Sequence, residues 1–554
     1  VLLGIAGMAF GWFVYSRFIA TRIFRLDPDF VTPAHQINDG VDYCPTNKYV
    51  LWGHHFTSVA GAAPIVGPAI AVYWGWVPAM LWVVLGTIFF AGVHDFGALW
   101  ASNRHRGKSI GALSEAVIGR RTRSLVMVVI FLVLLMVNAV FGVVIANAFV
   151  GTPGAVVPAW FAIVAAVIVG QLLRRHFNLS IVTALAVIAL YVSVYAGSVW
   201  PMEIPELFGL TVQSNWIIIL FVYAAIASML PVWVLLQPRD FINGMQLFIG
   251  LFLLYGAVFL VMPDVSAPAF NDRLPPDAPS LMPLLFVTIA CGAVSGFHGI
   301  VSSGTTSKQL DKETDARFVG YLGAVGEGSL ALITIVAVSG ALLAATPEAW
   351  HLIYEKFGSA GAGAFIDGGA NLIQTGWGIP VAVAQTLLAT MVVLFAATTM
   401  DTGVRLQRYI IQEWGQIYGI PLLDRSILAT LLAVGACLML AFGAGGGSGS
   451  GGLVIWPLFG STNQILAGIT LLIISVMLIK LGRPARYTLI PMVFVLLTSS
   501  WAAVLKLIEF YRDGNWLLVA IDGVVLVTSL LVILEAASVI SRFRRENRLP
   551  ARAL

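Results

Sequence analysis

Residues 53–61 of the chain read GHHFTSVAG, and residues 296–304 read GFHGIVSSG. Both stretches contain the pattern Gly-x-His-x5-Gly, once in each half of the chain. The first is followed by AAPIVGP at residues 62–68, and glycine and proline at such a density interrupt a helix. The two stretches therefore indicate an internal repeat in which each copy carries a histidine beside a helix break.

The composition places both copies in a membrane protein. The 554-residue chain is 59% hydrophobic and 10% charged, with a mean hydropathy of +0.91. Soluble domains carry about 25% charged residues, so a single water-soluble core is excluded. Strands that span a membrane alternate in polarity over about ten residues, whereas the apolar runs here are longer and uniform. The chain is predicted to be an all-α polytopic membrane protein.

Fifteen segments reach the roughly 20 apolar residues that a transmembrane helix needs. They cover residues 1–20, 50–73, 77–100, 124–150, 156–173, 179–200, 216–236, 244–261, 281–301, 319–345, 380–400, 426–442, 453–481, 487–507 and 516–540. The two copies of the repeat fall in the second and ninth segments. Because these segments are an odd number of spans apart, they cross the membrane in opposite directions, and the repeat is predicted to be inverted.

The basic residues of the connections indicate the orientation. With the N-terminus outside, 26 of the 31 Lys and Arg residues fall in inside connections or the tail, and 3 fall in outside connections. Lys and Arg are enriched in cytoplasmic loops, so the N-terminus is predicted to be periplasmic and the C-terminus cytoplasmic. The net charge of +4 is then a topology signal, and no basic stripe for nucleic acid is expected.

Inverted repeats that begin with a broken helix are typical of secondary transporters, which bind substrate between the two breaks. The backbone groups freed by a break must face a cavity or other protein. Close helix packing through small residues is the alternative use of such glycines. The candidate breaks are Gly61, Pro64, Gly67 and Pro68 in the first copy, and Gly292, Gly296, Gly299 and Gly304 in the second.

Ionisable side chains inside spans are costly and are therefore functional candidates. His54, His55 and His298 could bind a substrate carboxylate or carry a proton, because neutral imidazole both donates and accepts hydrogen bonds. A buried histidine that only satisfies a backbone group is the ordinary alternative. Three histidines could also bind zinc or haem, but no metal-ligand spacing supports this, and no metal or other cofactor is predicted.

Further candidates lie in later spans. Glu327 lies deep in the tenth segment and is predicted to be a proton site or a paired structural carboxylate. Thr398, Thr399 and Asp401 offer oxygen atoms suited to Na⁺, or a carboxylate for H⁺, although Asp401 could also cap a helix. Ser302 and Ser303 share this ambiguity, and with Gly61, Pro64 and the histidines they complete the expected substrate site.

Two polar regions near the inner ends of spans have plainer interpretations. Asp39 and Asp42 precede the first broken helix and, with Lys308, are predicted to form an inner gate, while a loop with Asx turns is the alternative. Asp95 lies near the end of the third segment, where contact with solvent is the favoured interpretation.

Ten longer strings resemble the carbon starvation protein A (CstA) family. They are TPAH at 32–35, NDGVDY at 38–43, PTNK at 45–48, GHHF at 53–56, GFH at 296–298, SSGTTSKQ at 302–309, ETDAR at 313–317, DTGVRLQRY at 401–409, WPLFG at 456–460 and NQ at 463–464. The resemblance implies a transporter of the bacterial inner membrane that imports short peptides, with relatives that import pyruvate with protons, and it implies no enzymatic activity.

The family is placed near the amino acid, polyamine and organocation transporters, so the resemblance also implies an inverted repeat of five plus five helices with a LeuT-like fold. Residues 50–200 and 281–481 become the repeats. Residues 1–49, 214–263 and 487–554 become an N-terminal span and loop, two additional spans, and two C-terminal spans with a basic tail. Thr398 and Thr399 then lie on the helix that contributes hydroxyls to a Na⁺ site in sodium-coupled relatives. Besides membrane lipid, the partners expected are peptides or pyruvate and H⁺ or Na⁺, and the oligomeric state stays open.

Overall fold

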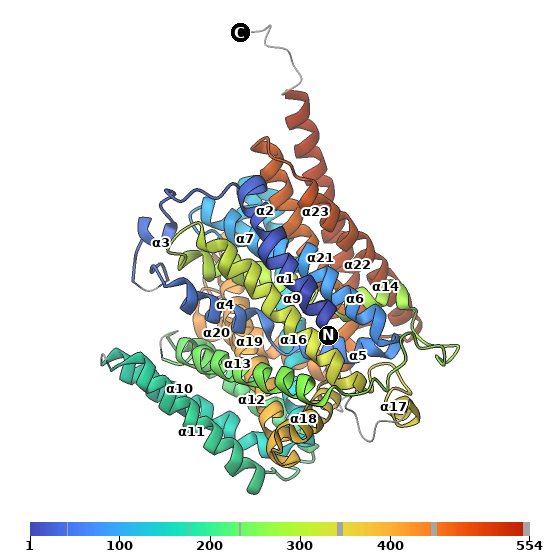
Figure 1. The fold of residues 1–554 in the computed structure, drawn as a ribbon. Helices are drawn as coiled ribbons and strands as arrows, with labels where there is room; N and C mark the ends of the chain where they lie inside the picture. Colours follow the sequence, from blue (N-terminus) through green and yellow to red (C-terminus); the bar gives the residue numbers. More distant parts are fainter. Residues whose placement is uncertain (41, 176, 232–233, 341–346, 445–450, 547–554) are drawn as a thin grey trace.

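The computed structural model describes all residues except 41, 176, 232–233, 341–346, 445–450 and 547–554. The described residues form helices joined by loops, with two isolated β-bridges (Figure 1). The last eight residues of the predicted basic tail lie outside this description. The helices of the first half are α1 Leu2–Phe10, α2 Ser16–Phe18, α3 Pro33–Gln36, α4 Lys48–Ala60, α5 Ala63–Ala71, α6 Trp76–Gly86, α7 Gly92–Arg104, α8 Ile110–Val117, α9 Arg120–Gly151, α10 Val156–Arg174, α11 Leu179–Val199, α12 Val212–Met229 and α13 Leu236–Val261.

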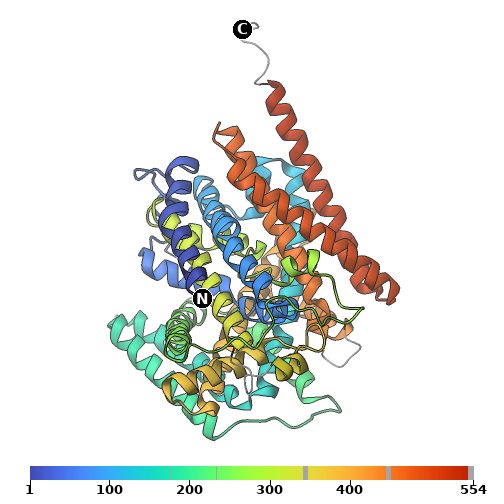
Figure 2. The same ribbon diagram turned by 45° about the vertical axis from the view of Figure 1, so that its right-hand side comes forward.

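The second half begins with two short helices and continues mostly with long ones. These are α14 Leu281–Thr288, α15 Gly296–Gly304, α16 Leu322–Gly340, α17 Pro347–Ile353, α18 Ala362–Trp377, α19 Val381–Tyr418, α20 Ser426–Gly443, α21 Gly451–Lys480, α22 Arg486–Arg512 and α23 Trp516–Glu546. In both views α10 and α11 lie side by side on one flank, and α22 and α23 lie on the opposite flank (Figures 1 and 2).

The predicted spans agree with the helices. Within the described residues, 13 helices are long and apolar enough to cross a membrane, or 14 when the bent pair Lys48–Ala60 and Ala63–Trp74 is counted as one span. Each corresponds to one predicted segment. The remaining predicted segment, 281–301, is divided between α14 and α15. The chain is thus a multi-pass helical membrane protein with two interrupted spans.

Of the eight candidate break residues, Gly61 and Gly292 lie in the interruptions. The others lie within helices, Pro64, Gly67 and Pro68 in α5 and Gly296, Gly299 and Gly304 in α15. The first interrupted span bends by 47° between α4 and α5, at Gly61, whose backbone has φ 51° and ψ −159°. The second is unwound over residues 289–295, which include Gly292 at φ 91°. Since glycine alone adopts such angles readily, the sequence decides the position of each break.

The two broken helices lie antiparallel. The first half of one, α4, packs against the second half of the other, α15, while α5 packs against α14. Gly67 of α5 lies directly against Thr288 at the end of α14. Two copies of one motif that pair head to tail are related by inversion, as the odd number of intervening spans predicts.

The loops predicted to share a side of the membrane also meet in space. At one end Arg104 binds Glu313, Arg483 donates to the carbonyl of Phe24, and Lys480 donates to the carbonyl of Val117. At the other end the backbone of Trp76 donates to Pro268, Asn271 donates to Tyr73, and Ser266 donates to Ser339. The basic residue between the seventh and eighth predicted spans, Arg239, lies within α13 and is 1% exposed.

Candidate functional site

The histidines of the two repeats converge on one face of α16. The ring of His55 lies against Gly323, where a side chain on residue 323 would collide with it. One helical turn further along α16, Glu327 lies 3.2 Å from Nε2 of His298. Glu327 is 1% exposed, and both histidines are completely buried. Residues four apart share a helix face, so α16 positions its glycine beneath one histidine and its carboxylate beside the other.

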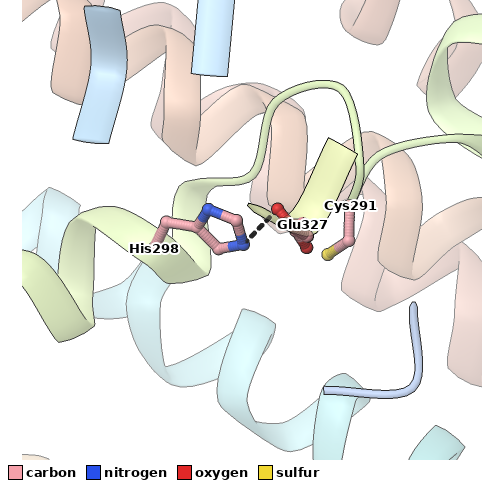
Figure 3. Close-up of side chains that lie close together, drawn as sticks. All are labelled: Cys291, His298 and Glu327. Atoms are coloured by element: carbon pink, nitrogen blue, oxygen red, sulfur yellow. Dashed lines mark ion pairs between the residues drawn. The ribbon is translucent and has the colours of Figure 1, made fainter. Parts of the chain in front are cut away.

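His298 is held between two carboxylates. Its Nδ1 donates to Oδ2 of Asp95 at 2.8 Å, and Nε2 faces Oε2 of Glu327 (Figure 3). Asp95 also accepts a hydrogen bond from Nδ1 of His94 at 2.7 Å. The prediction that Asp95 is solvated is wrong, since α7 extends four residues past the predicted span and Asp95 is completely buried against α15.

The charges of this cluster balance only when protons are bound. Two ionised carboxylates, Asp95 and Glu327, face two imidazoles, so neutrality requires a proton on each imidazole or on a carboxylate. Neither oxygen of Glu327 has a hydrogen-bond partner in the described structure. An uncompensated buried charge is costly in free energy, so bound protons would stabilise this cluster while it stays buried.

Cys291, in the unwound segment of the second broken helix, adds a thiol to this region. Its Sγ, Nε2 of His298 and a carboxylate oxygen of Glu327 lie within 4.8 Å of one another (Figure 3). These atoms could hold a transition-metal ion, and they could equally share a proton. The alternative in which His54, His55 and His298 bind one metal is not supported, because the described ligand group contains neither His54 nor His55.

The first break faces α19. A Cβ atom on Gly61 would lie 2.9 Å from Oγ1 of Thr399, whose hydroxyl is buried and has no hydrogen-bond partner among the residues that the structure describes. Pro64, just after this break, lies against Gly292 of the second break. The structure thus brings the two breaks together and places the Thr399 hydroxyl beside the first, while Thr398 accepts a hydrogen bond from Asn243 at 2.9 Å.

A second buried cluster joins α13 to α4, α12 and α19. Arg239 Nη1 donates to Oδ2 of Asp401 at 2.5 Å and to the Tyr223 hydroxyl at 2.6 Å. Asp240 Oδ2 lies 3.2 Å from Nδ1 of His54. Asp401, predicted to bind a coupling cation, therefore already faces an internal cation. Sequence reasoning missed Arg239 and Asp240 because they precede the apolar window that defined the eighth span.

Ser303 and Ser302 have different surroundings. Ser303 Oγ donates to the carbonyl of Gly299 at 2.7 Å and accepts from the backbone of Ile110 at 2.9 Å, which ties α15 to α8. Ser302 is completely buried, and its hydroxyl has no partner in the described structure. Ser303 is thus engaged within the protein, whereas Ser302 keeps a hydroxyl for another group.

A cavity of about 270 Å³ opens between these clusters and the predicted gate. Its lining includes His54, Lys308, Thr402 and Arg405. The charged groups of both signs around it suit a polar or zwitterionic molecule. This cavity extends from two of the predicted gate residues, Asp42 and Lys308, to His54.

The loops at the mouth of this cavity pair across the repeat. Thr46 forms a parallel bridge with Leu310, and its backbone donates to Gln309 at 3.0 Å. Lys308 Nζ lies 3.9 Å from Asp42, and Asp39 accepts backbone hydrogen bonds from residues 42 and 43. The structure thus brings two of the predicted gate residues together, while Asp39 shapes the loop.

Tyr43 belongs to the same mouth. Partial burial, together with the carboxylates of Asp42 and Asp39, raises the pKa of its phenol. The hydroxyl therefore stays protonated and donates to the carbonyl of Arg106 at 3.3 Å. The ammonium of Lys308 lies 5.3 Å from the centre of the Tyr43 ring, so the loop before α4 contacts both neighbouring loops.

Comparison with known proteins shows which family the chain resembles. The model of the family described as carbon starvation protein CstA matches residues 1–345 and 344–502. The peptide transporter CstA of Campylobacter jejuni is 32% identical over 94% of this chain and 81% of its own length. The pyruvate/proton symporter BtsT of Escherichia coli is 31% identical, over 89% of this chain and 79% of its own length.

Solved structures share the general architecture at low identity. MhsT in complex with L-phenylalanine is 12% identical over 89% of this chain and 99% of that one, with a TM-score of 0.47. A manganese transporter of Eremococcus coleocola is 13% identical over 92% and 99%, with a TM-score of 0.49. Because both scores lie below 0.5, the inversion of the repeat rests on the antiparallel broken helices themselves.

Proposed function

Because the chain belongs to the carbon starvation protein CstA family of membrane transporters, we propose that it is a proton-coupled importer of short peptides that works by alternating access. The observation that carries the proposal is the buried cluster of Asp95, His298 and Glu327 between the broken helices. Its charge is balanced only by protons, so a conformational change that hydrates it would release one. Coupling to H⁺ is therefore favoured over Na⁺.

The substrate class follows from the cavity and from the relatives. A zwitterionic peptide matches a cavity with charged groups of both signs. A small carboxylate such as pyruvate is the second candidate, because the relative named as a pyruvate/proton symporter is as similar to this chain as those named as peptide transporters. Both substrates are placed between the two breaks, near His55, Pro64 and Ser302.

We also propose that the end of the molecule with the paired loops faces the cytoplasm of a bacterial cell. The basic connections meet at this end, and cytoplasmic loops are enriched in Lys and Arg. The N-terminus is then periplasmic. The cavity opens towards the cytoplasmic end, which makes the structure an inward-facing form of the transporter.

Uptake into liposomes tests the proposal. The purified full-length chain is reconstituted, and uptake of radiolabelled alanyl-alanine or pyruvate is measured with an imposed pH gradient, an imposed Na⁺ gradient, or neither. We expect accumulation with the inward proton gradient alone. The His298→Gln variant is expected to lose this accumulation, because one glutamine amide cannot bridge two carboxylates as a protonated imidazole does.

Folding must be separated from function in this experiment. The thermal unfolding temperature of His298→Gln in detergent reports whether the variant is folded. Accumulation driven by Na⁺ and indifferent to pH would overturn the proton assignment. Transport of neither substrate class by the folded wild-type chain would overturn the proposed substrates.

A further inference from the structure

One face of α13 is polar although this helix lies within a span. Arg239, Asp240, Asn243 and Gln246 are each no more than 1% exposed. Positions 239, 243 and 246 follow the spacing of one helix face. This face packs against α4 and α19, the helices that carry the first break and the Thr399 hydroxyl. Polar side chains at such a place in a membrane protein indicate a site.

Arg239 presents a hydrogen-bonding edge that no described residue uses. Its Nη1 is engaged by Asp401 and Tyr223. Nε and Nη2 are both buried, and neither has a hydrogen-bond partner in the described structure. These two nitrogens form the side-on edge of the guanidinium, whose parallel N–H bonds match the two oxygens of a carboxylate. The free edge is therefore suited to an anionic group from outside the protein.

The position of Arg239 links this edge to the cavity. The next residue, Asp240, pairs with His54, whose side chain lines the cavity and is 17% exposed. The partner of Arg239, Asp401, precedes Thr402, which also lines the cavity. Arg239 is therefore linked to the cavity lining through one intervening residue on each side, Asp240 and Asp401. Asp240 Oδ1 is likewise buried and has no hydrogen-bond partner among the described residues.

We infer that Arg239 binds the carboxylate of the transported substrate through Nε and Nη2. The inference rests on the proposed function and adds a specificity-determining residue from α13, a helix outside the repeat. A peptide with a free C-terminus and a small monocarboxylate share this group, so one residue serves both substrate classes. Asp240 Oδ1 accepts a hydrogen bond from the ammonium group of a peptide, which pyruvate lacks.

Pairs of acids and amides test the inference in reconstituted full-length protein. Uptake KM values are measured, or inhibition constants where a probe is not transported, for alanyl-alanine and its C-terminal amide, and for pyruvate and pyruvamide. The wild type is expected to favour each acid by about 10- to 100-fold, as a lost bidentate charged pair would give. Arg239→Gln is expected to lose this preference, and Arg239→Lys to keep a small part of it.

Asp240→Asn distinguishes the two substrate classes. This variant is expected to raise the KM for alanyl-alanine by about tenfold, because one charged hydrogen bond is lost. The KM for pyruvate is expected to stay unchanged. If the KM for pyruvate rises equally, Asp240 does not bind the ammonium group. Arg317→Lys is the matched control, because this arginine of another span donates to Ser16 and to the carbonyl of Trp12, both at 2.8 Å, and should keep the preference for acids.

Arg239→Gln leaves the buried carboxylate of Asp401 without its cationic partner, and this unpaired charge destabilises the fold. The double variant Arg239→Gln with Asp401→Asn removes both charges and keeps the test available. A folded variant lacking Arg239 that still favours the acids would overturn the inference, as would a wild type that takes acids and amides equally. A wild type that neither transports nor binds the acids would overturn the proposed substrates and this inference together.

Discussion

His298 is hydrogen-bonded through one ring nitrogen and faces a carboxylate with the other, and this decides what its neighbours can do. Asp95 orients the ring through Nδ1 and is itself held by His94. Glu327 has the imidazole of His298 as its charged neighbour and lacks a hydrogen bond in the described structure. Of the two carboxylates, Glu327 can therefore gain or lose a proton while the hydrogen bond between Asp95 and His298 persists.

Replacing Glu327 should thus separate coupling from substrate binding. Glu327→Gln is expected to abolish accumulation driven by a proton gradient, because a neutral amide cannot release a proton when the site hydrates. Exchange of external for internal labelled substrate needs no net proton movement and should continue. Loss of exchange as well would contradict the assignment. Glu535→Gln on α23, whose carboxylate lies 3.9 Å from Arg121, is the control and should accumulate substrate normally.

The thiol, imidazole and carboxylate near the second break allow a metal-dependent alternative to be tested. A shared proton requires no metal, so dialysis against EDTA is expected to leave both uptake and the unfolding temperature unchanged. Elemental analysis of the purified chain checks that chelation was complete. Uptake that falls after chelation and returns with Zn²⁺ would contradict the proton assignment and identify a metal site.

At the scale of helices, the first break depends on one residue. Gly61 combines a positive φ with a position in contact with Thr399 and Phe141, so a methyl group there is strained and also collides. Gly61→Ala is expected to cost about 1–3 kcal/mol of stability and to stop uptake. Thermal unfolding in detergent and liposome uptake measure the two effects.

Gly53, in the middle of α4, provides the matched control for this substitution. A Cβ atom there would contact nothing within 4 Å, and alanine favours a helix by about 0.5–1 kcal/mol over glycine. Gly53→Ala should therefore keep uptake and raise the unfolding temperature slightly. If Gly61→Ala behaves like Gly53→Ala, the break at Gly61 is not required for transport.

The sequence predicted the elements better than their contacts. Gly61 and Gly292 located the two interruptions, because glycine determines local backbone geometry, although the second Gly-x-His-x5-Gly stretch is itself the helix that follows its interruption. The partners of His298 could not be predicted, since Asp95 lies one span from His55 and six from His298 in the order of the chain. Arg239 was missed because the predicted span included only the apolar residues of α13, and the polar residues of this helix lie in its first turns.

For the molecule as a whole, the charge pattern and the packing agree. Loops predicted to be cytoplasmic meet at one end, where the segment before α4 pairs with the segment after α15. The bridge between Thr46 and Leu310 joins these two segments next to the cavity that reaches His54. Because each segment is continuous with a broken helix, we expect both broken helices to move when this mouth opens or closes.

The native cysteines allow the orientation and this movement to be measured without introducing further cysteines. Cys44 lies partly exposed in the loop before α4, whereas Cys291 and Cys437 are buried. A membrane-impermeant maleimide is therefore expected to label inside-out vesicles and not right-side-out ones, and Cys44→Ser should remove the label. Labelling of right-side-out vesicles alone would reverse the orientation. We expect the loops to close over the cavity in an outward-facing form. Substrate that favours the inward-facing form should then accelerate labelling of Cys44, and a rate indifferent to saturating substrate would contradict movement of this mouth during transport.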